Sequence, residues 1–182
     1  TDVNVLHYPQ IPITKTIMHE ISNNEKHPFG QNVVIAIMSY EGYNMDDAII
    51  LNKSSVERGL GRTTYFKPFK AEELRYQGGL VDEIGIPDKD VKGYKTEKDY
   101  RFLEEDGITY QGAQVGEGDV IIGKVSPPRF LGEFVEFGVS ASVKRESSVA
   151  LTANERGKVY MILVTENEDG NRLIQLRVVD HR

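Results

Sequence analysis

The hydrophobic pattern of the chain predicts β-structure along most of its length. Val33–Met38 has no polar face, which indicates a strand buried on both sides, and Ala48–Leu51 is a second apolar run of strand length. Val159–Thr165 and Leu173–Val179 flank a segment that contains Asp-Gly, a pair typical of hairpin turns. Further strands are expected at Thr63–Phe69, at Asp119–Val125 and, from strict alternation of apolar and small or polar residues, at Val135–Val143.

Helical patterns are few and short. Ile13–Ile21 is compatible with a short helix that Asn23-Asn24 would end. Asn52 has the position of an N-cap for a single helical turn through Arg58, with a stop at Gly59. About eight strands with little helix predict a mainly β fold with short helices, built as a barrel or a sandwich.

The middle of the chain, Ala71–Asp106, is rich in charges of both signs. Its acidic residues outnumber its basic ones, and Gly78-Gly79 interrupts it. Because segments of mixed charge rarely build a core, we expect this part to be a solvated excursion on the surface.

Composition narrows the classes of function. The chain has 182 residues and no cysteine, which excludes disulfides, thiolate zinc sites and a cysteine nucleophile. A net charge of −6 argues against a general binder of phosphate backbones. No apolar run is long enough for a membrane helix and no signal peptide is recognisable, which predicts a soluble intracellular protein without membrane contact. The chain opens on Thr1 and stops directly after an expected strand, so we expect it to be part of something longer.

The main candidate for chemistry is the acidic pair Asp46-Asp47, which ends the segment Gly42–Asp47 between the two apolar runs. Two adjacent carboxylates are poor packing material, and they suit either a hard cation or a solvated turn. In a strand, neighbouring side chains point to opposite faces, whereas in a turn both can reach one ion. Mg²⁺ usually takes one or two protein carboxylates and completes its shell with water and phosphate. The spacing leaves both interpretations open.

Other candidates are weaker. Gly116–Ile121 resembles the turns of biotinyl and lipoyl carrier domains, in which Lys124 would carry the cofactor, although it lacks the flanking residues of such a hairpin. The four histidines are scattered without metal-ligand spacing. The basic pairs Lys144-Arg145 and Arg156/Lys158 suit either solvated faces or contact with a nucleic-acid or protein partner.

Several longer strings resemble one family. They are Tyr8–Pro12, Gly30–Ala36, Gly42–Asn52, Ser54–Gly59 and, later in the chain, Gly118–Lys124, Gly157–Val159 and Leu176–Val179. Together they resemble the second-largest subunit of multisubunit DNA-directed RNA polymerase in its archaeal and eukaryotic form. The resemblance covers both ends of the chain, and only the acidic middle lacks clear matches.

The resemblance implies a fold and a place in the cell. Thr1–Arg62 would belong to the hybrid-binding region, which holds part of a double-psi β-barrel. Thr63–Arg182 would be the wall, or flap, an inserted domain of the β-barrel or sandwich-hybrid type that guides the RNA–DNA hybrid. The location would be cytoplasmic in an archaeal-like cell and nuclear in a eukaryote.

The resemblance also implies a mechanism, in which a nucleotidyltransferase uses two Mg²⁺ ions for phosphoryl transfer. The ion that arrives with the nucleoside triphosphate would be shared with Asp46 and Asp47. Asp47 matches the family's aspartate and would be the more direct ligand, whereas Asp46 stands where many relatives have glutamate. The implied partners are the largest polymerase subunit, the other subunits, the DNA template with its RNA–DNA hybrid, nucleoside triphosphates and transcription factor B.

Two departures limit what the chain can do by itself. Ile11 stands where relatives often carry a basic residue, and a lysine-containing segment of the family would begin only after Arg182. The isolated chain is therefore expected to be inactive as a polymerase. The rival hypotheses are a non-catalytic module that docks an initiation factor and a biotinyl-like carrier.

Overall fold

A computed structural model describes residues 1–128 and 144–182, and these residues are mainly β. The strands are β1 (Val3–Leu6), β2 (Thr63–Glu72), β3 (Glu83–Ile84), β4 (Gln114–Val115), β5 (Val120–Ile122), β6 (Lys124–Ser126), β7 (Arg145–Glu146), β8 (Val149–Ala150), β9 (Gly157–Glu166) and β10 (Arg172–His181). The helices are α1 (Ile17–Ile21), α2 (Lys53–Glu57) and the 3₁₀-helix η1 (Glu97–Tyr100). The expectation of a mainly β chain with short helices is confirmed.

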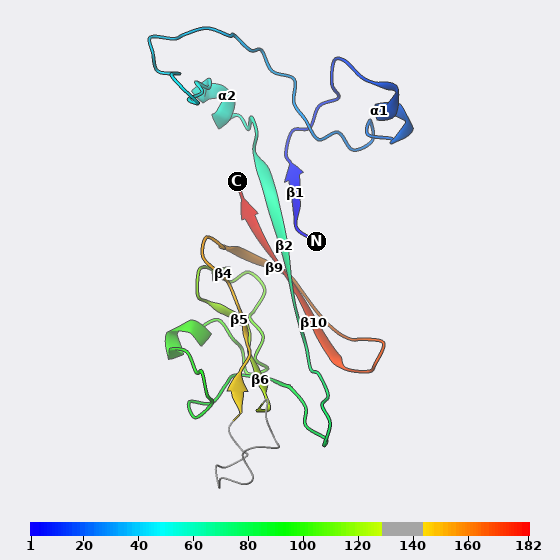
Figure 1. Ribbon diagram of the computed structural model, residues 1–182, viewed down its shortest axis with the longest axis vertical. Coiled ribbons are helices and arrows are strands. Elements are labelled where there is room, and N and C mark those ends of the chain that lie inside the picture. Colours follow the sequence, from blue (N-terminus) through cyan, green and yellow to red (C-terminus); the bar gives the residue numbers. More distant parts are fainter. Residues whose placement is uncertain (129–143) are drawn as a thin grey trace. The chain divides into compact units, whose positions relative to one another are not determined.

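The chain divides into two compact units. The larger unit contains residues 66–180 together with 1–2, and the smaller unit contains residues 3–65 together with 181–182. The larger unit holds most of β2, all of β9, and β10 up to Asp180. These strands are neighbours in the sheet order β1-β2-β10-β9-β4, and they run side by side in Figure 1.

The longest pairing is the β9–β10 hairpin of the larger unit. Its antiparallel register pairs Arg172 with Glu166 at the turn end, and it shifts by one residue between Arg177 and Val178. Such a bulge bends the strand and increases its local twist. Gly170 in the turn has a φ of 74°, a backbone conformation that favours glycine. The predicted hairpin is confirmed.

The core of the larger unit lies on one face of this sheet. It comprises Ala71, Ile108, Ala113, Val115, Ile121, Ile122, Leu151, Val159, Ile174, Leu176 and Val178. All three residues of β5 are fully buried. The apolar runs in β5, β9 and β10 therefore form one common core.

The strand predicted at Asp119–Val125 is in fact two short strands that separate at Gly123. Strand β5 pairs with β8, whereas β6 pairs with β3 and β7. The backbone of Gly123 approaches other glycines closely, since its N–H donates to the Gly107 carbonyl at 2.8 Å and its carbonyl accepts from Gly85 N–H at 3.0 Å. A side chain at Gly123 would meet the Gly85 oxygen, so glycine is needed where the chain changes its strand partners.

The acidic middle is more ordered than its composition predicts. It contains η1, which begins with a capping box between Thr96 and Asp99, and β3. Tyr100 and Asp82 are buried. The expectation of a purely solvated excursion is wrong at these positions, where Asp82 Oδ2 is engaged by Lys124 and Tyr76, and the Tyr100 hydroxyl accepts from Lys95 N–H.

The smaller unit contains both predicted helices, although α1 covers only Ile17–Ile21 of the predicted range Ile13–Ile21. Helix α1 ends before a turn that includes Asn23, and helix α2 begins at the N-cap Asn52, whose side chain accepts a hydrogen bond from Ser55 N–H at 3.0 Å. Gly59, with a φ of 111°, ends the turn after α2 and packs against the Tyr8 ring. Gly59 is the one buried residue of this unit, all of which the structure describes.

Two predicted strands are absent. Val33–Met38 and Ala48–Leu51 are extended or irregular, and neither pairs with another described strand. Val34 and Ile37 are fully exposed, and Ile49 is 82% exposed. A strand needs a neighbour for its backbone hydrogen bonds and cover for its apolar side chains, and neither run has them here. The strand predicted at Val135–Val143 lies outside the described residues.

Candidate functional site

The acidic pair lies at the end of a tight loop in the smaller unit. Asn44 organises this loop: its side-chain oxygen accepts from Tyr40 N–H at 2.9 Å, and its side-chain amide donates to the Met38 carbonyl at 2.6 Å. Two backbone turns follow, in which Met45 N–H donates to the Gly42 carbonyl and Ala48 N–H donates to the Met45 carbonyl. Asparagine favours such turns because its side chain can replace backbone partners.

Both carboxylates of the pair are exposed on this loop. Asp46 has a φ of 56°, in the left-handed region that aspartate tolerates better than most residues. Neither Asp46 nor Asp47 has a hydrogen bond or ion pair to any described residue. The pair is thus in a turn rather than a strand, the conformation in which both side chains can reach one ion. The described residues contain no group of three or more metal-ligating side chains, so the pair has no third protein ligand there.

A second polar cluster, also in the smaller unit, was not predicted from the sequence. The Thr64 hydroxyl lies 2.5 Å from His7 Nε2 and 3.2 Å from His181 Nδ1. The two imidazole rings meet edge to face with centroids 6.0 Å apart. No spacing rule could have found this cluster, because strand pairing joins residues from opposite ends of the sequence.

The carrier hypothesis fails at Lys124. Its side chain is only 15% exposed, and its ammonium donates to Asp82 Oδ2 at 3.0 Å and to the Glu72 carbonyl at 3.3 Å. The preceding turn has a structural explanation, since Asp119 Oδ2 accepts from Gly116 N–H at 2.8 Å. A buried, ion-paired lysine cannot present a cofactor at a hairpin tip.

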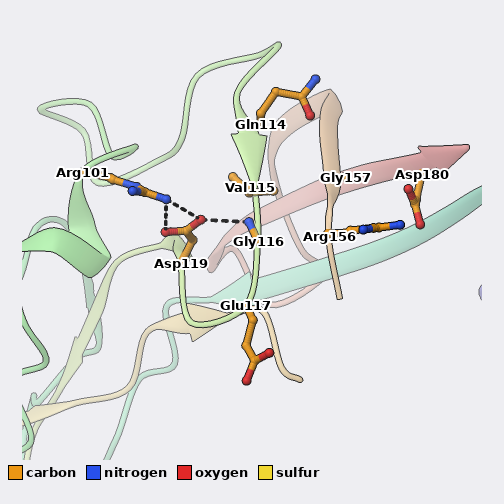
Figure 2. A pocket seen from close by; sticks show the side chains of 9 residues that line it. All are labelled: Arg101, Gln114, Val115, Gly116, Glu117, Asp119, Arg156, Gly157 and Asp180. Atoms are coloured by element: carbon orange, nitrogen blue, oxygen red, sulfur yellow. Dashed lines mark hydrogen bonds and ion pairs between the residues drawn. The ribbon is translucent and has the colours of Figure 1, made fainter. Parts of the chain in front are cut away.

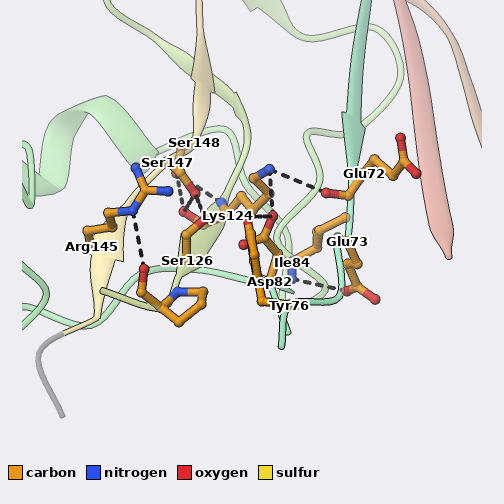
Figure 3. A network of polar contacts seen from close by, with 11 residues as sticks. Glu72, Glu73, Tyr76, Asp82, Ile84, Lys124, Ser126, Arg145, Ser147 and Ser148 are labelled. Carbon is orange, nitrogen blue, oxygen red and sulfur yellow. Dashed lines mark hydrogen bonds and ion pairs between the residues drawn. The ribbon is translucent and has the colours of Figure 1, made fainter. Parts of the chain in front are cut away.

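Figure 3 shows that Lys124 belongs to a network of polar groups in the larger unit. Tyr76 donates to Asp82 Oδ2 at 3.3 Å, and the hydroxyls of Ser126 and Ser147 lie 2.6 Å apart. Burial by itself raises the pKa of Asp82, but Ser126 and Lys124 outweigh it and leave the pKa below its usual value. Burial raises the pKa of Tyr76, and the neighbouring Asp82 carboxylate raises it further. This network holds strands together and offers no exposed catalytic group.

The larger unit also has an open polar cavity of about 490 Å³ (Figure 2). Its lining includes the ion pair between Arg101 and the largely buried Asp119, at 3.1 Å, together with Glu117, Arg156 and Asp180. Charges of both signs are mixed in this lining, and it contains no histidine or other evident base beside a nucleophile. The cavity therefore gives no enzyme site of its own.

The two basic pairs differ in their surroundings. Lys144 forms an ion pair with Glu83 at 2.5 Å, and Arg145 Nε donates to the Pro127 carbonyl. Arg156 and Lys158 are exposed. The first pair is thus engaged within the fold, and contact of the second pair with a partner stays a prediction.

Comparison with known proteins decides the family. The model of the family described as RNA polymerase Rpb2, domain 6, matches residues 1–182. The chain belongs to this family. It is 47% identical over 182 residues to the DNA-directed RNA polymerase subunit Rpo2 of Sulfolobus acidocaldarius. The aligned region covers 100% of this chain and 16% of that subunit.

Eukaryotic relatives are similar along nearly the whole chain. The chain is 32% identical over 178 residues to the RNA polymerase II subunit RPB2 of Schizosaccharomyces pombe. The aligned region covers 98% of this chain and 15% of that relative. The identity is also 32% over 172 residues with the RNA polymerase III subunit RPC2 of the same yeast, where the aligned region covers 93% of this chain and 15% of that relative. The chain thus spans about one sixth of the relatives it matches. Among the described residues, no helix is long and apolar enough to cross a membrane.

Proposed function

We propose that this part of an RNA polymerase second-largest subunit contributes Asp47 as a direct ligand, and Asp46 through water, to the Mg²⁺ that accompanies the incoming nucleoside triphosphate. The observation that carries the proposal is the acidic pair itself. It consists of two exposed carboxylates without protein partners, on a turn held by Asn44. Their oxygens are therefore free to coordinate an ion.

The donor set fits Mg²⁺. This ion prefers oxygen ligands, keeps several waters, and usually binds through one or two carboxylates plus substrate phosphates. Two adjacent aspartates without a third protein ligand meet that description, whereas a zinc site would need histidine or cysteine at the loop. When bound, the ion would neutralise the charge of the triphosphate and stabilise the departing pyrophosphate.

The two residues have different roles in this proposal. Asp47 binds the ion directly, in agreement with its match to the family motif. Asp46 has a shorter side chain than the glutamate of many relatives and reaches the ion through water. Asn44 holds the turn that carries both carboxylates.

The remaining parts of the proposal concern domains and partners. Residues 1–62 would complete a double-psi β-barrel with other parts of the enzyme, and residues 63–182 would form the wall that guides the RNA–DNA hybrid. The partners would be the largest subunit, other polymerase subunits, the DNA template, nucleoside triphosphates and transcription factor B. The similarity to Rpo2 and RPB2 along the whole chain supports this assignment.

The test is a magnesium titration of the assembled polymerase carrying Asp47→Ala in the full subunit. We expect the Mg²⁺ concentration for half-maximal elongation to rise at least about tenfold, because loss of a ligand weakens metal binding by that order or more. Glu41→Ala is the matched control, since Glu41 is an exposed carboxylate in the same loop. An unchanged titration for Asp47→Ala would disprove the metal role.

A further inference from the structure

The β2–β10–β9 sheet of the larger unit has a second face, opposite to the core. In β2, Ala71 belongs to the core and Phe69 packs against it, so the alternate positions Phe66, Pro68 and Lys70 point to the other side. In β10, Leu176 and Val178 are core residues, so Arg177 between them points away from the core.

Strand β9 completes this second face through its register with β10. Met161 pairs with Arg177 and Leu163 pairs with Gln175, and side chains of paired residues lie on the same side of a sheet. We call the surface of these strands the outer face. Its members include Phe66, Pro68, Lys70, Met161, Leu163, Gln175 and Arg177, and at its turn end Glu72, whose carboxylate accepts from the Asn167 side chain.

Apolar side chains of β9 on the outer face are partly open to solvent, at a stretch where β9 pairs with β10 on one side only among the described strands. Met161 is 42% exposed and Leu163 is 47% exposed, whereas the core residues of the same hairpin, Val159 and Leu176, are almost fully buried. Tyr160, at the bulge, is 54% exposed and packs edge to face on Phe66 with ring centroids 5.9 Å apart. Exposed apolar side chains gathered on one face are typical of an interaction surface.

The charges beside the patch indicate what kind of partner it accepts. The side chains of Lys70 and Arg177 have no ion pair or hydrogen bond with a described residue, although the chain as a whole carries a net charge of −6. Methionine, arginine and aromatic residues are the types enriched at protein interfaces. The outer face is therefore apolar with unpaired cations, complementary to an apolar segment that carries carboxylates.

A single-stranded nucleic acid is the less suitable occupant. Bases bind by stacking on open aromatic faces. Here the two aromatic rings pack on one another, and the exposed apolar side chains of β9 on this face, Met161 and Leu163, are aliphatic. These side chains give area for protein contact but no platform for a base.

We propose that the outer face is a contact surface for another subunit of the assembled polymerase, which covers Met161 and Leu163 with an apolar segment and pairs carboxylates with Lys70 and Arg177. The inference rests on membership in the polymerase family and is independent of the magnesium role of Asp47. Its readout is solvent protection, which the metal role does not affect.

The first experiment measures protection of single cysteines in the full subunit. Leu163→Cys and Val164→Cys are matched, because these neighbours are 47% and 48% exposed but point to opposite faces of β9. We expect maleimide labelling of the Leu163 variant, quantified by mass spectrometry of its peptide, to slow at least about tenfold on assembly. Labelling of the Val164 variant would keep its rate.

Three outcomes would overturn the proposal. They are equal labelling of both variants in the assembled enzyme, protection of the Leu163 variant already in the isolated subunit, and protection that appears only when RNA is added. The second would mean that the subunit covers its own face, and the third would mean that the occupant is nucleic acid.

A second experiment tests the charge complementarity without disturbing the apolar centre. Carbodiimide treatment of the assembled enzyme should join the Lys70 amine to a carboxylate of another subunit, and the cross-linked peptide names that subunit. Lys70→Arg keeps the charge but removes the reactive amine, so the cross-link should disappear. Absence of an intersubunit cross-link at Lys70 in the unmodified enzyme would contradict the pairing.

Discussion

Lys124 Nζ lies 3.0 Å from Asp82 Oδ2, and neither side chain is open to solvent, with exposures of 15% and 0%. The pair joins β6 to the residue that precedes β3, across 42 positions of sequence. Removal of one partner from a buried ion pair leaves an uncompensated charge, which costs far more than the pair contributes in net terms.

We therefore predict that Asp82→Ala lowers the free energy of unfolding by about 3–5 kcal/mol. Denaturant unfolding of the chain checks this value. Glu83→Ala is the control, because the neighbouring Glu83–Lys144 pair is half exposed and should contribute about 1 kcal/mol or less. Equal losses for the two variants would contradict the structural importance of the buried pair.

Stability should also depend on pH through Asp82. Burial raises the pKa of this carboxyl, but hydrogen bonds from Ser126 and Lys124 and the Lys124 charge leave it below the ordinary value of 3.8. A carboxylate that is harder to protonate when folded stabilises the protein above pH 3.8, and this stabilisation is lost as the pH falls through the folded pKa. Asp82→Asn should therefore flatten the dependence of stability on pH below about pH 4. Parallel curves for the two proteins would contradict this origin.

The loop that carries the acidic pair should depend on Asn44. Asn44→Ala removes the bonds to Tyr40 N–H and to the Met38 carbonyl, and the net value of one such bond is about 0.5–1.5 kcal/mol. We expect amide exchange at Tyr40 to accelerate by roughly two- to tenfold. Asn44→Asp keeps an acceptor for Tyr40 and loses only the donor, so it should leave that exchange rate nearly unchanged. Faster exchange at Tyr40 in Asn44→Asp than in Asn44→Ala would contradict a hydrogen bond from Tyr40 N–H to the Asn44 side chain.

A comparison of alanine substitutions at two glycines should distinguish the cost of a strained backbone from the cost of a steric clash. Gly107 and Gly118 have φ values of 78° and 83°, but an added Cβ at Gly107 would lie 2.4 Å from Gly85 Cα, whereas nothing lies within 4 Å at Gly118. Gly118→Ala should cost about 1–2 kcal/mol of unfolding free energy from the left-handed conformation alone. Gly107→Ala should cost about 2–5 kcal/mol, because overpacking adds to that strain. Thermal unfolding of both variants measures the difference between their losses of unfolding free energy. Equal losses would show that the backbone at Gly85 moves aside without an energetic cost.

The parts of the fold predicted from the sequence are those that neighbouring residues decide. The N-cap at Asn52 and the Asp169-Gly170 turn between β9 and β10 each depend on hydrogen bonds over a few positions. The acidic pair was also found by sequence, through the long motif around it, and its turn conformation agrees with one of the two interpretations of Asp46 and Asp47 that spacing left open.

The errors arose where partners are distant. The apolar pattern of Val33–Met38 predicts a strand, but no described strand pairs with it, and Ile37 stays exposed. The run Asp119–Val125 is continuous in sequence and yet divides at Gly123, because close glycine backbones there redirect its pairing. Hydrophobicity shows that a segment can be buried, and the presence of a neighbour decides whether it is.

The sequence by itself determined the mainly β class, the hairpin, the caps and the family motif that contains Asp46 and Asp47. Tertiary structure alone decided that Lys124 is buried against Asp82, that Thr64 lies between His7 and His181, and that Met161 and Leu163 share an exposed face with Arg177. The physical reason is the sequence separation of the interacting residues. Turns and caps form between residues a few positions apart, whereas strand register brings together side chains that are far apart in the sequence, and no local pattern predicts which of them will meet.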